Sequence, residues 1–241
     1  MDVIVLLDSS SSAGEVGYQS QKDFVGLLSN GIDMSPAGSR IGVISYSSDA
    51  RLDVTPEAYD NAVGLQSAIS DLKFLGGSSR IDTAFDVAFN DLFAVSTGAR
   101  PGVPRVAVLF TAGKETNTTD YETLRFAVEP FKGEGIPVIV VGIGANADLQ
   151  RLRVLVDSDE LILAAESFEE LSDLALNVTL LACKAAGEQT VLLGLYSYNS
   201  YLHDLGRAFC TAMGPRSLFY SSCSFDQLHY EYHDARFSVF P

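Results

Sequence analysis

Short runs of consecutive apolar residues recur along the chain, and longer stretches between them carry apolar residues at every third or fourth position. The runs predict buried strands, and the longer stretches predict helices that each bury one face. A segment at 51–54 alternates between apolar and polar residues after a turn at Ser48 and Asp49, which indicates an edge strand. Strands are predicted at 3–7, 40–46, 51–54, 105–111, 137–141 and 160–164, and helices at 19–32, 60–72, 81–89, 120–132 and 167–181.

Strands that alternate with helices predict an α/β fold with right-handed crossovers. We therefore expect a doubly wound, mostly parallel six-stranded sheet with one antiparallel edge strand and helices on both faces. The alternation ends near Cys183, and residues 184–241 hold 11 of the 24 Phe and Tyr residues and all three histidines. That composition is too aromatic for a flexible linker. We expect one domain over residues 1–183, followed by an irregular, aromatic-rich C-terminal segment over residues 184–241.

A polar motif directly follows the first apolar run. Asp8, Ser10 and Ser12 form a D-x-S-x-S pattern at the expected carboxyl end of that strand. In open parallel sheets, ligands bind beyond this end of the strands. A set of oxygen ligands suits a hard divalent cation such as Mg2+. The alternative is a serine-rich turn in which Asp8 caps the next helix, and the motif alone does not decide between the two.

Charge and targeting signals narrow the function. The net charge of −15 argues against binding to nucleic acid or to an anionic membrane. No apolar run reaches the roughly 18 residues of a membrane span. Met1 and Asp2 lead directly into the first strand without a signal peptide, so either the protein is cytoplasmic or the sequence is a stretch of a longer one. Asn117 and Asn177 each begin an N-x-T glycosylation triplet, which slightly favours a secreted protein.

Four strings, in this order and at these intervals, resemble the von Willebrand factor type A domain, also called the integrin I domain, and its matrilin and collagen VI group in particular. They are DVIVLLDSSSS at 2–12, RIGVISYSS at 40–48, LGGSSRIDTA at 75–84 and VIVVGIG at 138–144. The resemblance covers about residues 2–183. It implies a metal-ion-dependent adhesion site, at which one divalent ion bridges the domain to an acidic group on a protein partner.

The resemblance assigns the metal ligands residue by residue. Asp8, Ser10 and Ser12 match the first loop of the site, and Ser79 stands where the family usually has Thr. In the third loop, Ala112 replaces the usual Asp, which should weaken the attraction for Mg2+, Mn2+ or Ca2+ because that attraction depends on the number of carboxylates. Asp82 or Glu115 would have to reach in to restore the charge, or Lys114 would partly replace the ion. Some family members bind partners without a working metal site.

The same loops supply the residues expected to contact a partner. These are Ser9, Ser11, Ser78, Thr111, Lys114 and Glu115. The expected partner is an extracellular protein that offers an acidic side chain, with a matrix or collagen-like protein as one candidate.

The three cysteines and the paired histidines allow further chemistry. His229 and His233, with Cys210 and Cys223 upstream, have a spacing that a zinc site would need, but no C-x-x-C pair accompanies them, so zinc is the less favoured interpretation. Cys210 and Cys223 alternatively form a local disulfide in an oxidising compartment. By the resemblance, Cys183 follows the last helix and its partner would precede the first strand, where this sequence has no cysteine.

Enzymatic function is disfavoured. The sequence has no G-x-S-x-G nucleophile motif and no G-x-x-x-x-G-K-[ST] phosphate loop. Asp8 follows a strand as in phosphatases with an aspartate nucleophile, but Ser10 replaces the second Asp that they need. We therefore predict a non-enzymatic, extracellular adhesion module with a degenerate metal site, from a chain that lacks its native N-terminus and signal peptide. The alternative is a cytoplasmic scaffold subunit with the same fold that binds without metal.

Overall fold

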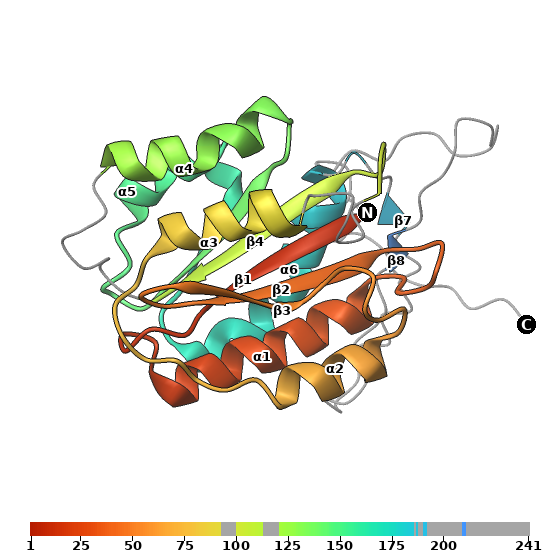
Figure 1. Cartoon of the computed structure of the whole chain (residues 1–241), viewed down its shortest axis with the longest axis horizontal. Helices are drawn as coiled ribbons and strands as arrows, with labels where there is room; N and C mark the ends of the chain where they lie inside the picture. The colour runs from red at the N-terminus through yellow and green to blue at the C-terminus, as the bar shows by residue number, and fades with distance from the viewer. Residues whose placement is uncertain (93–99, 113–120, 186, 188–189, 192–208, 211–241) are drawn as a thin grey trace, which may run out of the picture.

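Six strands form one sheet in the order β3-β2-β1-β4-β5-β6 (Figure 1). The structure is a computed structural model that describes residues 1–92, 100–112, 121–185, 187, 190–191 and 209–210. β2 pairs antiparallel with β3, and the other neighbouring strands of the sheet pair in parallel, which confirms the predicted topology. The strands are β1 (Asp2–Asp8), β2 (Arg40–Tyr46), β3 (Ala50–Val54), β4 (Arg105–Thr111), β5 (Val138–Ile143) and β6 (Ile162–Ala165).

Helices cover both faces of the sheet, as predicted. Figure 1 shows α1, α2 and α6 on one side and α3, α4 and α5 on the other. The α-helices are α1 (Gly14–Gly31), α2 (Ala62–Ser70), α3 (Ile81–Val87), α4 (Tyr121–Gly133), α5 (Leu149–Leu152) and α6 (Leu171–Ala185). Shorter helical turns are the π-helical η1 (Ala88–Leu92) and the 3-10 helices η3 (Arg153–Leu155), η4 (Asp159–Leu161) and η5 (Phe168–Glu170).

The central strand β1 explains why the sheet has two cores. Successive strand residues point to opposite faces. Val3, Val5 and Leu7 pack with α1 and α6, whereas Ile4 and Leu6 pack with α3 and α4. The five side chains are 0% exposed, so the uninterrupted apolar run reflects burial on both faces, as parallel sheets require.

The first helix begins five residues before its predicted start at residue 19. α1 begins at Gly14, directly after the serine turn, and Gly17 lies in its first turns. Glycine lowers helix propensity, so the sequence pattern favours a loop here. The structure explains this glycine. A Cβ at Gly17 would clash with the Phe168 ring in η5, so only glycine lets the helix and the ring approach each other this closely.

Two other predictions at the carboxyl half need correction. The sequence analysis did not predict α5 and η3, because seven residues are too few to show a helical period. Cys183 lies inside α6 rather than after it, is 0% exposed, and is disulfide-bonded. A missing partner ahead of β1 is therefore not needed to explain this cysteine. The side chains of Cys210 and Cys223 lie outside the part of the protein that the structure describes.

Beyond α6, the structure describes one short antiparallel pair, β7 (Thr190–Val191) with β8 (Phe209–Cys210). The predicted zinc alternative at His229 and His233 lies outside the described residues. The division into 1–183 and 184–241 stays a prediction. Within the described ranges, no helix combines the length and the apolar character needed to cross a membrane.

A buried series of polar side chains links α1 to the edge strand β3. Tyr18 is 1% exposed, and its hydroxyl lies 2.6 Å from Ser45 Oγ. Ser45 donates in turn to the Asp53 carboxylate, which pairs with Arg51 at 2.5 Å. Burial, helped by the negative charge of Asp53, raises the pKa of Tyr18 to about 12 from an ordinary value of 10.0.

We expect Tyr18→Phe to remove a loss of stability at high pH. Because the folded-state pKa lies above the unfolded value of 10.0, the stability linked to the neutral phenol is complete below pH 10 and is lost as the pH rises through about 12. The linked loss is roughly 2–3 kcal/mol. Urea unfolding between about pH 8 and pH 12 should show a steeper decline for the wild type than for Tyr18→Phe.

The matched control is Tyr121→Phe, because the Tyr121 side chain is 52% exposed. This variant should decline with pH as the wild type does. Parallel curves for the wild type and Tyr18→Phe would contradict the proposed titration.

Candidate metal-binding site

The candidate site lies where the strand order reverses. The chain leaves β1 for β2 and β3 on one side of the sheet, then returns to β4 on the other side of β1. Ligands of doubly wound sheets bind at such a switch point, beyond the carboxyl ends of the strands. Asp8 ends β1 and Ala112 follows β4, and the Ala112 N–H donates to Asp8 Oδ2 across this point at 3.0 Å.

Asp8 is the buried negative charge at the centre of the site, with 0% of its surface exposed. Its Oδ1 accepts a hydrogen bond from the Ser10 N–H at 2.9 Å, so both carboxylate oxygens are held by backbone donors. The amide group of Gln21 holds the Asp8 backbone, accepting from the Asp8 N–H at 2.7 Å and donating to the Asp8 carbonyl at 3.0 Å. Asp8 forms no ion pair in the described part of the protein. Its negative charge is therefore oriented but not neutralised.

Burial of Asp8 raises the pKa of its carboxyl above the ordinary 3.8, although hydrogen bonds from Ser10 and from the Ala112 backbone act in the opposite direction. A carboxylate that is costly to ionise in a dry site gains most from a nearby cation. The electrostatics of Asp8 therefore suit a bound metal ion.

Strand register places Thr111 next to Asp8. β1 and β4 align Leu6 with Leu109, and continuing this register by two residues sets Asp8 beside Thr111. By the alternation of the strands, both side chains face the side of the sheet that α3 and α4 cover. On the other side of Asp8, Tyr46 is its partner in β2, and the Tyr46 hydroxyl donates to the Phe110 carbonyl at 2.6 Å.

Four hydrogen bonds join the first loop of the site (residues 8–12) to the second loop (residues 75–79). Ser9 accepts from Leu75 N–H through its Oγ at 2.8 Å and from Gly76 N–H through its carbonyl at 2.9 Å. Ser11 donates its N–H to the Gly77 carbonyl and accepts the Gly77 N–H at its Oγ, both at 2.9 Å. Ser79 follows two residues after Gly77, so these bonds bring it to the same edge as Asp8.

Ser48, in the turn between β2 and β3, holds the second loop from its other side. Its Oγ accepts the Ser78 N–H at 3.1 Å and lies 3.0 Å from Ser78 Oγ. Gly77 adopts φ +93°, and a Cβ there would lie 2.6 Å from Ser48 Oγ. The sequence analysis named Ser48 only as a turn residue and did not single out Gln21, because their contacts cross 30 and 13 residues of sequence.

The hydroxyls of the site test whether a cation fits. Ser79 and Thr111 are buried, at 2% and 1% exposure, yet Ser79 Oγ and Thr111 Oγ1 have no hydrogen-bond partner among the described residues. Buried polar atoms are normally satisfied, so an orphaned oxygen indicates a missing water or ion. Ser10 Oγ and Ser12 Oγ share a hydrogen bond at 2.7 Å, which places both oxygens together in the first loop. The residues present fit a divalent cation.

Comparisons with known proteins identify the family of this chain. The family model of the von Willebrand factor type A domain matches residues 2–177. The chain belongs to this family. Von Willebrand factor A domain-containing protein 2 of Xenopus laevis is 28% identical over 77% of this chain and 23% of its own length, and human matrilin-4 is 29% identical over 73% of this chain and 28% of its own length. The chain thus spans about a quarter of these curated relatives.

A solved structure of another von Willebrand factor type A protein has the same fold. Proximal thread matrix protein 1 from the mussel byssus superposes with a TM-score of 0.70 and 28% identity, over 79% of this chain and 48% of that one. A further structure of the same protein has zinc in its metal-ion-dependent adhesion site (MIDAS) motif. It superposes with a TM-score of 0.66 and 27% identity over 79% of this chain and 49% of that one. The family assignment predicted from the four strings is confirmed.

Among the described residues, Asp8 is the acidic side chain of the candidate site. Asp82 had been an alternative source of charge, but it pairs with Arg80, whose guanidinium donates to both of its carboxylate oxygens at 2.8 and 2.5 Å. Partial burial acts to raise the pKa of Asp82, and the bonds and charge of Arg80 outweigh it and lower the pKa. The described residues contain no cluster of three or more His, Cys, Asp or Glu side chains that could hold a metal. Asp82 therefore does not replace the carboxylate that Ala112 lacks, and Glu115 lies outside the described residues.

The predicted partner-contact residues divide by burial. Ser11 is exposed and Ser78 is half-buried, so both are accessible at the rim. Ser9 and Thr111 are buried, at 0% and 1% exposure, so a partner cannot touch their side chains, and we remove them from the contact set. Lys114 and Glu115 lie outside the described residues, as does the glycosylation candidate Asn117. Asn177 is exposed on α6, and its glycosylation stays a prediction.

Proposed function

We propose that this domain is a non-enzymatic protein-binding module that uses a divalent cation at the switch point to dock an acidic group of an extracellular matrix-type protein. One observation carries the proposal. A buried carboxylate without an ion pair among the described residues lies at the same edge of the sheet as two orphaned buried hydroxyls, where hydrogen bonds hold the first and second loops together. When bound, the cation would supply a positive charge that a partner carboxylate could ligate.

Each residue of the site has a distinct task in this proposal. Asp8 supplies the negative charge, and Ser10, Ser12 and Ser79 supply neutral oxygens for Mg2+, Mn2+ or Ca2+. Thr111, at the end of β4, would hydrogen-bond a water molecule that is bound to the ion. The serine rim of Ser11, Ser48 and Ser78 would contact the partner around the ion. Similarity to proximal thread matrix protein 1 and to matrilins supports the extracellular setting.

The test is capture of partners from solubilised extracellular matrix by the immobilised full-length protein, in Mg2+ and in EDTA. We expect specific proteins to bind in Mg2+ and to elute with EDTA, and Asp8→Asn to behave in Mg2+ as the wild type does in EDTA. Capture that is equal in Mg2+ and EDTA would reject the metal-dependent function.

Such a result would favour the second candidate, a metal-independent scaffold, which the absence of a carboxylate at Ala112 supports. The two candidates also differ in compartment. Glycan at Asn117 or Asn177, measured as added intact mass of the natural protein, would exclude the cytoplasmic alternative.

A further inference from the structure

α2 is a short helix that depends on its neighbours. It has nine residues, and its buried residues are Leu65 and Ile69. Helices of this length are marginal in water without tertiary contacts. The negative end of a helix dipole favours a cation, but the C-cap residue of α2 is Asp71 and the last turn of α2 has no basic residue. The C-terminal end of α2 therefore needs a positive charge from elsewhere.

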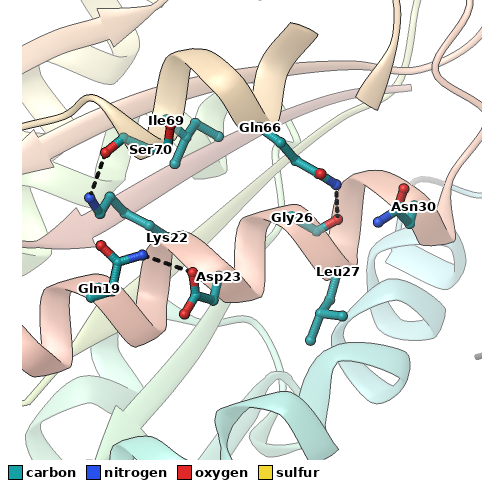
Figure 2. Close-up of a pocket in the computed structure, with 9 residues that line it drawn as sticks. All are labelled: Gln19, Lys22, Asp23, Gly26, Leu27, Asn30, Gln66, Ile69 and Ser70. Atoms are coloured by element: carbon teal, nitrogen blue, oxygen red, sulfur yellow. Dashed lines mark hydrogen bonds between the residues drawn. The ribbon is translucent and has the colours of Figure 1, made fainter. Parts of the chain in front are cut away.

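Lys22 of α1 supplies that charge, and it lines the groove of about 280 Å3 between α1 and α2 (Figure 2). Its ammonium donates to the Ser70 and Leu72 carbonyls at 3.1 and 3.3 Å and lies 5.5 Å from the centre of the Tyr18 ring. Lys22 is 7% exposed, so water competes little for these bonds. Lys22 thus acts as a C-terminal cap of α2 that another helix provides.

The segment that Lys22 holds continues directly into the second loop of the site. Phe74 packs against Tyr18, with the two ring centres 6.1 Å apart. The next residue, Leu75, donates its N–H to Ser9 Oγ at 2.8 Å. This segment is therefore held by α1 at its start and by the first loop at its end.

One side of α1 carries supports for both loops. Gln21 and Lys22 follow Tyr18 by three and four positions, a spacing that brings side chains to one side of a helix. Gln21 holds the backbone of Asp8 in the first loop. Lys22 and Tyr18 hold the segment that leads into the second loop. α1 is thus a common base that fixes the two loops relative to each other.

We infer that Lys22 is a positioning residue of the proposed metal site. By capping α2, it keeps the second loop, and with it the Ser79 hydroxyl, in place beside the first loop. The inference rests on the proposed function for its effect on cation binding, whereas the order of the second loop can be measured without a cation. Loss of the ammonium should loosen residues 71–79 locally, beyond any general loss of stability.

The test is hydrogen exchange of the full-length protein, measured by mass spectrometry in EDTA. Lys22→Met keeps a stem of similar length and removes the ammonium. We expect the amides of residues 71–79 to exchange roughly tenfold faster or more in this variant, because a hydrogen bond from a charged donor contributes at least that factor. Lys22→Arg, which keeps a charged donor and can stack on Tyr18, should exchange within about threefold of the wild type.

Two controls separate positioning from general effects. Lys73→Met removes the same charge from an exposed position in the same segment and should exchange as the wild type does. Ile136→Val weakens the core on the opposite face of the sheet, with a shift in the unfolding equilibrium of roughly twofold to tenfold. This variant should melt at a lower temperature but leave the exchange of residues 71–79 unchanged.

Unchanged exchange of residues 71–79 in Lys22→Met would overturn the inference. Equal acceleration in Ile136→Val, or equally fast exchange in Lys22→Arg and Lys22→Met, would overturn it as well.

Mn2+ calorimetry on the same variants measures the consequence at the site. Lys22→Met should bind Mn2+ severalfold more weakly than Lys73→Met does, and equal affinities would show that Lys22 does not position the site. An absence of Mn2+ binding to the wild type would reject the proposed function, whereas the exchange of residues 71–79 would still decide whether Lys22 holds the second loop.

Discussion

Replacing Asp8 with asparagine should abolish cation binding and reduce cation-dependent partner binding by roughly a hundredfold or more, since loss of one member of a buried charge pair costs about 3–5 kcal/mol. The asparagine would keep the size of the side chain but remove the carboxylate that the described residues supply to the site. Calorimetry with Mn2+ in acetate measures the loss directly. Asp60→Asn, which removes a charge from an exposed position ahead of α2, should bind Mn2+ as the wild type does.

The same substitution should change how stability depends on pH in EDTA. The folded-state pKa of Asp8 is raised by burial, so the stability linked to its neutral form is complete below the unfolded value of 3.8 and is lost as the pH rises through the raised pKa. The melting temperature of the wild type should therefore fall more between about pH 4 and pH 8 than that of Asp8→Asn. Asparagine lacks the second acceptor for Ser10 and Ala112, which lowers the stability of the variant at every pH. Mn2+ that binds Asp8→Asn as tightly as the wild type would contradict the role of Asp8.

Replacing Gly77 with alanine should destabilise the protein by about 2–4 kcal/mol and weaken Mn2+ binding. The loss combines backbone strain at a positive φ with a steric clash of the new methyl group. At φ +93°, any L-residue is strained, and the new Cβ would lie 2.6 Å from Ser48 Oγ. Relief of this contact would displace the turn or the second loop and, with it, Ser79. Urea unfolding and Mn2+ calorimetry measure the two effects.

Gly102→Ala is the control that separates backbone strain at a positive φ from the steric contact with Ser48. Gly102 has φ +73°, and its added Cβ would meet nothing within 4 Å, so it should lose only about 1 kcal/mol and bind Mn2+ normally. The double variant Ser48→Ala with Gly77→Ala should recover part of the stability, since the close oxygen is removed. Equal losses for Gly77→Ala and Gly102→Ala would show that Ser48 does not restrain the second loop.

The four inner strands β1, β2, β4 and β5 were predictable because each is buried on both faces and its sequence is therefore a nearly continuous apolar run. Residues 40–46 and 105–111 match β2 and β4 at both ends. The start of α1 was not predictable, because Gly17 suits the helix only through its packing against Phe168. Local sequence carries no information about such a distant neighbour.

The candidate site follows the same division. The place of Asp8, Ser10 and Ser12 at the end of β1 was predictable from the motif, and Ser79 was named by the family resemblance; the structure brings their loops to one edge of the sheet, and their role as metal ligands stays a prediction. The buried state of Ser9 and Thr111 was not predictable, because it depends on which face of each strand the helices cover. Gln21 and Ser48 act through hydrogen bonds from their side chains to backbone groups, which no local pattern reveals.

Crystals of the full-length protein grown with Mn2+ and acetate would test the central claim most directly, by anomalous scattering at the manganese edge. Oxygens from separate loops that enclose one cation predict a single peak at the end of β1, within roughly 2–2.5 Å of ligand oxygens from Ser10, Ser12 and Ser79, with the Asp8 carboxylate next to it and acetate on its outer side. A peak elsewhere, or none at the end of β1, would contradict the claim.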